Sequence, residues 1–575
     1  MLALAVSAQA AEITVDAPDD LKALILKFAG ALKKPTAEPE AGPEGEAGPA
    51  QDVQVELQSR ARRAREDIFP LLETEGYFSA KVDLVPGRDG DITLKVTPGR
   101  RTEIREVRIE FKGAIADDAA KYAERRQDIE GRWRLPVGRP FRQADWANAK
   151  EALLNSVSEH DFAAAKLVET TADIDPIRGA ARLHLVVDSG PPFRLGELEV
   201  SGLDLYSREL VDRYNMLKPG EPYDYDRLVT LQNTLQATPY FAAAIIEIDR
   251  DPDKADATPV RVRLTEANPK RLGVSLGYST NTGFRSEANY RNANIFNEAL
   301  ELNTSIRLEQ KRQSAFADVF FPQTFSAFRD AVGATVLSED ISNLKTERWA
   351  IGATRTRTLH KTEIRVNLNY QHETTEPEGG TQTESKALTL NYGADLRDVD
   401  SLTDPQAGLL LGFQIGGGAK ALLSDQNFLR LYGRGQYFRP IGKQGTLLLR
   451  GEIGCTIADS REGIPQDFLV RTGGSQSVRG YDYQSLGVQD GSAVVGGRML
   501  FVSSVEYINW FKPPWGVAVF VDAGNAADEW KDMTLKVGEG FGGRWKSPAG
   551  PLGLDLAWGK GSSIPKVHFS IAFVF

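Results

Sequence analysis

Cysteine, methionine and histidine are scarce in this sequence of 575 residues, which contains one Cys, four Met and five His. The single cysteine, Cys455, has no second thiol with which to form an internal disulfide, so the fold must be stable without one. The histidines show none of the spacings typical of metal ligands. We therefore expect no metal site and no other cofactor.

Long apolar runs are also missing, and the chain has an excess of acidic residues. After residue 11, no stretch approaches the roughly 18 consecutive apolar residues of a transmembrane helix, which excludes such a helix. A transmembrane β-barrel remains compatible with the sequence, because its strands alternate apolar and polar residues. The formal net charge of -10 argues against a nucleic-acid partner.

The first 11 residues have the composition of a processed leader. Ala8-Gln9-Ala10 follows a short apolar run and matches the A-x-A cleavage pattern, although no basic region precedes it. We interpret residues 1–11 as the remnant of a signal peptide. An alanine-rich terminus without a targeting role is the alternative.

Three similar segments recur in the N-terminal half, centred on Phe78, Phe162 and Phe241. Their spacing of about 80 residues is too long for a solenoid and is typical of a string of small domains. A predicted helix precedes each Phe and a strand follows it. We expect the three phenylalanines to lie in the domain cores, closing the second helix on the sheet.

Each repeat is predicted to have the element order β-α-α-β-β, which resembles the POTRA domain. In the second repeat, the predicted elements include a strand at 104–111, helices at 117–128 and 144–158, and a strand at 181–187. The predicted domains are 12–100, 101–192 and 193–268. Residues 33–51 contain four prolines with Glu, Gly and Ala between them, and we expect a disordered insert there.

From residue 269 onward the pattern has a period of two. Leu272, Val274 and Leu276, for example, alternate with small or polar residues, and the last residues alternate in the same way. One apolar and one polar face suit a barrel with lipid outside and water inside. A soluble sandwich would alternate too, but it rarely has strands this long. At about 19 residues per strand, residues 269–575 predict an antiparallel barrel of roughly sixteen strands.

Four segments of this half resemble one family. Residues 476–487 contain Val478-Arg479-Gly480-Tyr481, which is similar to the Val-Arg-Gly-Phe/Tyr motif of the BamA/TamA outer-membrane assembly factors. Further matches lie at 291–296, 520–525 and 544–552, in the family's order. The resemblance implies POTRA domains in the periplasm and a sixteen-stranded barrel in the outer membrane of a Gram-negative bacterium. Three POTRA domains favour the TamA type within that family.

The resemblance also implies a lock between loop and barrel. In the family, the arginine that corresponds to Arg479 lies on a loop folded into the barrel and meets acidic residues on the wall. Strand parity places Glu506 and Asp522 on the lumenal face. We predict that Arg479, Gly480 and Tyr481 dock there, with the guanidinium shared by the two carboxylates. Ordinary lumenal charges with solvated neighbours are the alternative.

The first and last strands are predicted to meet at a lateral seam. The first strand contains Leu272, Gly273, Val274 and Gly277, and the last contains Phe573 and Phe575. A closed barrel of even strand number pairs these strands antiparallel. Because glycines weaken strand packing, we expect a seam that opens readily.

Two motifs suggest enzymes but lie in strand-like sequence. Residues 273–277 match the G-x-S-x-G nucleophile elbow, and residues 538–543 match the dinucleotide-binding G-x-G-x-x-G pattern. The first lacks a following helix, and Pro548 prevents a helix after the second. We find no catalytic residues and predict that the protein is not an enzyme.

The function implied is assembly or translocation of outer-membrane proteins. POTRA strand edges would capture extended substrates, and the seam would insert them into lipid. The resemblance implies unfolded outer-membrane proteins such as autotransporters as substrates, and a TamB-like periplasmic or inner-membrane partner. A two-partner secretion transporter and a BamA-type insertase are alternatives. Outside this class, a passive porin or a periplasm-spanning structural anchor would also fit a barrel with periplasmic domains.

Overall fold

The computed structural model describes residues 12–32, 50–87, 90–323, 328–547 and 550–571. The predicted signal segment lies outside these residues, and so does the predicted insert except for its last two residues. Those two residues, Ala50 and Gln51, belong to helix α2 (Ala50–Thr74) and not to an insert.

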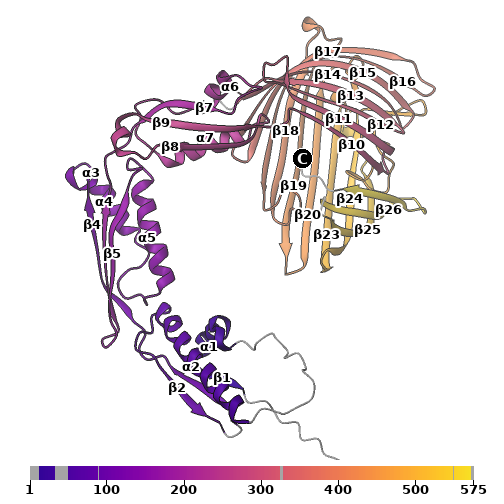
Figure 1. Cartoon of the computed structure of the whole chain (residues 1–575). Helices are drawn as coiled ribbons and strands as arrows, with labels where there is room; N and C mark the ends of the chain where they lie inside the picture. The colour runs from indigo at the N-terminus through magenta and orange to yellow at the C-terminus, as the bar shows by residue number, and fades with distance from the viewer. Residues whose placement is uncertain (1–11, 33–49, 88–89, 324–327, 548–549, 572–575) are drawn as a thin grey trace, which may run out of the picture. The chain divides into compact units, whose positions relative to one another are not determined.

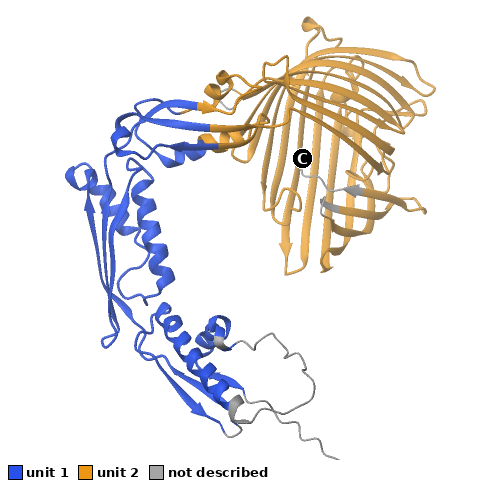
Figure 2. Ribbon diagram, viewed as in Figure 1, with its two compact units in different colours: residues 1–199, 217–230, 245–262 blue, residues 200–216, 231–244, 263–575 orange. Residues whose placement is uncertain are grey.

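The chain forms two compact units, shown in different colours in Figure 2. One comprises residues 1–199, 217–230 and 245–262, and the other comprises residues 200–216, 231–244 and 263–575. Along the chain, three β-α-α-β-β units of the POTRA type precede the barrel (Figure 1). The third POTRA-like unit therefore contributes residues to both compact units.

The first POTRA-like unit has a three-stranded sheet in the order β1-β3-β2. Strand β1 pairs parallel with β3, and β2 pairs antiparallel with β3. Its core is apolar and includes Ile25, Ile68 and Leu94, each of which is fully buried. Its elements are β1 (Ile13–Asp16), α1 (Asp19–Phe28), α2 (Ala50–Thr74), β2 (Lys81–Pro86) and β3 (Ile92–Thr97).

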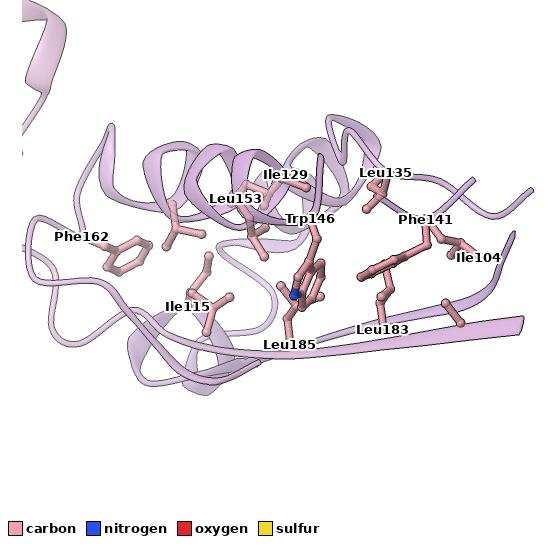
Figure 3. Close-up of a cluster of buried hydrophobic side chains, with 14 of the residues drawn as sticks. Ile104, Ile115, Ile129, Leu135, Phe141, Trp146, Leu153, Phe162, Leu183 and Leu185 are labelled. Atoms are coloured by element: carbon pink, nitrogen blue, oxygen red, sulfur yellow. The ribbon is translucent and has the colours of Figure 1, made fainter. Parts of the chain in front are cut away.

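The second unit repeats this plan, with the sheet order β4-β6-β5. Figure 3 shows its core, in which Trp146, Phe162 and Leu185 lie between the helices and the sheet. Its elements are β4 (Glu103–Lys112), α3 (Ala114–Asp117), α4 (Ala123–Gly131), α5 (Gln143–Ser158), β5 (Lys166–Asp175) and β6 (Ala180–Asp188).

The single helix predicted at 117–128 is wrong, because the chain forms α3 and α4 instead. Asp118 leaves helical geometry, with φ -101° and ψ 67°. Its carboxylate accepts a hydrogen bond from the backbone N–H of Lys121 at 3.3 Å. Such a local side-chain bond competes with helical hydrogen bonding and separates the two helices.

The third unit has the sheet order β7-β9-β8. Its elements are β7 (Leu195–Ser201), α6 (Arg208–Tyr214), α7 (Tyr225–Gln236), β8 (Phe241–Ile248) and β9 (Thr258–Glu266).

Two of the three repeated phenylalanines occupy the predicted core positions. Phe162 and Phe241 are buried. Phe78 is only half-buried and packs against the core of the second unit, with its ring centroid 5.9 Å from that of Phe141. The reason is the close approach of the turn at Gly76, where an added Cβ would lie 2.2 Å from the Phe141 carbonyl oxygen.

The C-terminal part forms one sixteen-stranded sheet, and consecutive strands in it pair antiparallel (Figure 1). Among the residues that the structure describes, no helix is both long and apolar enough to cross a membrane. The two sequences that resembled enzyme motifs lie within strands β10 and β25. The strands are β10 (Lys270–Ser279), β11 (Gly283–Ile295), β12 (Leu300–Glu309), β13 (Arg312–Phe320), β14 (Phe328–Ile341), β15 (Leu344–Leu359), β16 (Thr362–Pro377), β17 (Thr383–Val399), β18 (Gly408–Gly418), β19 (Phe428–Ile441), β20 (Gly445–Ile457), β23 (Met499–Lys512), β24 (Trp515–Ala527), β25 (Lys536–Ser547), β26 (Gly550–Gly559) and β27 (Lys566–Ile571).

The predicted pairing of first and last strands is not found within the described part of the chain. Strands β10 and β27 form the two edges of the sheet, so the barrel is nearly closed with an unsealed seam. Near that seam, the backbone N–H of Phe569, a register partner of Leu554 on β26, donates to the Thr280 hydroxyl at 3.3 Å. The predicted seam residues on β10 lie on this open edge, whereas Phe573 and Phe575 lie outside the described residues.

Candidate functional site: the inner loop and its docking wall

The long segment 458–498 joins β20 to β23 and carries Arg479. It contains a short 3-10 helix (Gln466–Phe468) and a small hairpin of β21 (Val488–Asp490) and β22 (Ala493–Val495). Its contacts with lumenal side chains of several barrel strands place it inside the barrel, and we call it the inner loop. Glycine and serine around Arg479 favour a loop locally, as the sequence predicted.

Arg479 is 2% exposed and is among the largest fully buried side chains of the described chain. Its Nε and Nη2 donate to the two carboxylate oxygens of Asp522 at 2.7 and 2.9 Å. Its Nη1 donates to Glu506 at 2.7 Å and to Asp555 at 3.0 Å. The guanidinium also lies over the Phe520 ring, 3.2 Å from its centroid. The structure thus brings together Arg479 and both predicted carboxylates, with the two-pronged geometry that favours Arg over Lys.

Sequence reasoning missed three charged members of this cluster. Arg544 donates to Glu506 at 2.7 Å and also contacts Asp555. Arg450 lies 3.8 Å from Asp522. Three arginines therefore face three carboxylates, which compensates the charges that burial would otherwise make costly. The alternation that identified Glu506 would also have found Asp555, which lies between Leu554 and Leu556 on β26.

Glycines on the wall leave room for the loop backbone beside Arg479. Gly538 and Gly559 are register partners on β25 and β26. A Cβ on Gly538 would lie 1.8 Å from the Arg479 carbonyl oxygen, and one on Gly559 would lie 2.9 Å from the Tyr481 ring. Gly480 has φ +90°, and a Cβ there would lie 2.5 Å from the Gly559 nitrogen. The loop tip therefore approaches the wall more closely than any larger residue permits.

A second group of contacts holds the inner loop to the wall formed by β14 to β16. Arg471 lies 3.5 Å from Glu339 on β14. Glu373 on β16 accepts a hydrogen bond from the backbone N–H of Gln466 at 2.7 Å. Arg348 on β15 forms an ion pair with Asp467. The loop is thus bound to two different parts of the barrel wall, and nothing in the sequence marked the second one.

The inner loop also contacts residues on both sides of the seam. The Gly480 N–H donates to His568 Nε2 on β27 at 2.9 Å, and Asp482 forms an ion pair with Lys566. On the other side, the Ser475 hydroxyl donates to the Asn281 side chain at 3.4 Å, directly after β10. These contacts tie the inner loop to both sides of the seam.

The charged cluster has the properties of a structural lock and lacks those of a reactive centre. Every carboxylate in it accepts hydrogen bonds from at least one arginine. Within the described ranges, no group of His, Cys, Asp and Glu could hold a metal ion. What the arrangement can do is fix the position of the loop within the barrel and link that position to the last strand.

Comparison with known proteins agrees with this architecture. The family model described as the Omp85 superfamily domain matches residues 268–575. The solved structure of BamA from Haemophilus ducreyi, which lacks POTRA domains 1–3, is 16% identical, with a TM-score of 0.70 over 81% of this chain and 98% of that one. CdiB from Acinetobacter baumannii is 14% identical, with a TM-score of 0.45 over 82% and 90% of the two chains. Since the family model covers more than half of the sequence, this chain belongs to the Omp85 superfamily.

Proposed function

We propose that this protein captures extended segments of outer-membrane proteins and inserts them at the gap between β10 and β27. As an Omp85 protein it is a non-enzymatic insertion or translocation factor, with its barrel in the outer membrane and its POTRA domains in the periplasm. The observation that carries the proposal is the pair of unpaired edges in an otherwise continuous sheet. A strand edge facing lipid has no water to bond its free N–H and C=O groups, so an incoming strand is strongly favoured there.

Strand β10 suits the role of a template. It is ten residues long, and its side chains Leu272, Val274 and Leu276 are largely exposed. Gly273 has no neighbouring atom within 4 Å of an added Cβ, so its packing against the next strand is weak. An arriving strand would form hydrogen bonds with the free edge of β10 without first breaking an existing strand pair.

The POTRA-like units offer further strand edges. Each three-stranded sheet has two edge strands, such as β4 and β5 in the second unit. Extended polypeptides add to such edges through main-chain hydrogen bonds, which do not depend on the sequence of the substrate. We infer that these units receive unfolded substrates before insertion.

The lock at Arg479 would hold the inner loop while the seam opens. Its partners Glu506, Asp522 and Asp555 lie on β23, β24 and β26, close to the last strand in the sheet order. The bond between Gly480 and His568 links this lock directly to β27. Loss of the lock would therefore leave the edge of the seam without a fixed position.

Three POTRA-like units support the TamA type within the superfamily. On that basis we propose autotransporter-like barrels as substrates and a TamB-like periplasmic partner. A BamA-type insertase or a two-partner secretion transporter would use the same edges on other substrates. Capture of envelope proteins on the purified, membrane-embedded chain would distinguish these types.

Cross-linking of the seam tests the proposal. In a Cys455→Ser background, the substitutions Thr280→Cys and Phe569→Cys place thiols on the two sides of the seam, where the two residues already share a hydrogen bond. A short thiol cross-linker should lock the seam. We expect the locked protein to insert into the membrane normally and to lose substrate assembly, with activity returning after cleavage of the cross-link.

A matched control places the cross-link between strands that are already paired. Ala288 and Ile306 are register partners on β11 and β12. Cysteines there should cross-link without loss of assembly, because that ladder stays closed in the proposed mechanism. Wild-type assembly by a fully cross-linked seam would rule out insertion at the gap.

A further inference from the structure

A cavity of about 780 Å³ lies where residues 234–242 meet the first strands of the barrel. All of its lining residues belong to the compact unit that contains the barrel. Its lining includes Arg271 near the start of β10, Arg291 near the end of β11 and Arg329 near the start of β14. The cavity lies apart from the Arg479 cluster and has no part in the lock.

The charges that line this cavity are unbalanced. Glu301 is the only carboxylate among the described lining residues, against the three arginines. One of its oxygens lies 2.8 Å from Arg291 Nε, and the other accepts from Arg329 at 3.2 Å. Glu301 also accepts a hydrogen bond from the Asn303 amide at 3.0 Å. Arg271 is not among the partners of this carboxylate in the described part of the chain.

Arg291 pairs with Glu301, whereas Arg271 does not. The two arginines are register partners on β10 and β11, and like charges directly opposite each other destabilise a strand pair. In the described part of the chain, the exposed Arg271 side chain has no carboxylate or hydrogen-bond partner of its own. An anion between the two guanidinium groups would relieve the repulsion and give Arg271 an acceptor.

Aromatic side chains also line the cavity. They are Tyr214, Tyr240, Phe241 and Phe321. Burial raises the pKa of the Tyr240 phenol, whose O–H donates to the Ala299 carbonyl at 2.9 Å, so the phenol carries no charge. The cavity thus combines a cationic with an aromatic lining, at a volume typical of small-molecule sites.

We propose that this cavity binds an anionic phosphate group, supplied by a phospholipid headgroup of the periplasmic leaflet or by free phosphate. The N–H groups of one guanidinium can bind two oxygens of a phosphate at once. Arg271 and Arg291 are register partners on neighbouring strands, so one phosphate can contact both side chains. The volume exceeds what a free phosphate fills, which favours a headgroup whose glycerol and first acyl carbons contact the aromatic side chains of the lining. This site goes beyond the proposed insertion function and does not depend on it.

The test uses the purified full chain in detergent and the variant Arg271→Gln. In the lipid arm, native mass spectrometry follows retention of added dioleoyl phosphatidylglycerol. In the phosphate arm, inorganic phosphate is titrated and the midpoint of thermal unfolding is recorded. We expect one tightly held lipid on the wild type and roughly tenfold weaker retention by the variant, the usual effect of removing a charged hydrogen bond.

The control is Arg285→Gln, which removes the same charge at the other end of the β10–β11 hairpin, opposite Gly277. It should retain the lipid as the wild type does. Arg271-dependent stabilisation by inorganic phosphate without lipid retention would assign the site to a free anion. If Arg271→Gln changes neither arm, or if Arg285→Gln weakens retention equally, the inference is wrong.

Discussion

The POTRA-like units are built around apolar cores, whereas the barrel adds buried charges to its apolar contacts. In the second POTRA-like unit, most fully buried side chains are apolar, as with Phe162, Leu183 and Leu185. Beneath the inner loop of the barrel, an apolar cluster that includes Val478 and Leu500 accompanies buried charges, with Arg479 at 2% exposure and Asp522 at 0%. The barrel instead exposes Val517, Val519 and Val521 on its outer face.

The contrast follows from what surrounds each region. A periplasmic domain is stabilised by removing apolar surface from water. The lumen of a barrel in lipid can in addition hold polar groups, provided that they are paired. Beside the apolar clusters of the lumen, a charge network can therefore fix the inner loop, while the apolar side chains of the outer face contact the membrane.

The largest effect is expected in the POTRA core. Phe162→Ala should destabilise the second unit by about 3–5 kcal/mol, because it leaves a cavity in a fully buried site. Hydrogen exchange of the full chain, read over residues 101–192, measures the change. Val168→Ala on β5 is the control, since Val168 is 52% exposed and its loss should cost little. Similar protection in the two variants would mean that the apolar core is not what stabilises this unit.

A comparable effect is expected from a charged residue in the barrel. Arg479→Ala leaves three carboxylates short of a partner, which costs about 3–5 kcal/mol in a dry site and less in a lumen that admits water. The temperature at which the barrel loses its folded mobility on gels should fall. Arg461→Ala, in the same loop but on partly exposed ion pairs, should cost less than about 1 kcal/mol.

The double variant Arg479→Ala with Glu506→Ala sharpens this result. Because the two side chains hydrogen-bond at 2.7 Å, the double substitution should cost less than the two single substitutions together. Strict additivity on the same gels would show that the two residues do not interact in the membrane-embedded protein.

Two exposed valines allow a direct comparison of the outer face of the barrel with the surface of the second POTRA-like unit. Val519 on β24 and Val168 on β5 have similar exposure, 56% and 52%. Val519→Arg should destabilise the barrel by about 2–4 kcal/mol, because its surroundings are lipid. Val168→Arg should change stability by no more than about 0.5 kcal/mol, because its surroundings are water. Equal effects in chemical unfolding of the two variants would contradict the assignment of the outer barrel face to lipid.

The smallest effect is expected at the exposed ion pair between the loop and the last strand. Lys566 and Asp482 retain 37% and 74% of their side-chain exposure. Lys566→Ala should therefore change barrel stability by less than about 1 kcal/mol, as is usual for exposed pairs. Thermal unfolding in detergent measures this, with Arg479→Ala as the reference. An effect as large as that of Arg479→Ala would show that the pair is shielded from water in the membrane.

Much of the architecture follows from local patterns in the sequence. The period of two from residue 269 onward, the repeated phenylalanines and the β-α-α-β-β order predicted a barrel behind three POTRA-like units. These features depend on side chains that alternate or recur along the chain, and such patterns can be recognised without knowledge of tertiary contacts. The alternation of side chains along a strand likewise placed Glu506 and Asp522 on the lumenal face.

Other features were decided only when distant segments met. Arg544, Asp555 and Arg450 join Arg479 from separate strands, and no local pattern in the sequence connects them. Phe78 packs on the core of the neighbouring unit because the turn at Gly76 abuts Phe141. The link between β27 and the inner loop through His568 is of the same kind, because a hydrogen bond between residues 88 positions apart cannot be read from alternation. Local periodicity sets which face a side chain takes, whereas the partner on that face depends on how the whole sheet curves around the loop.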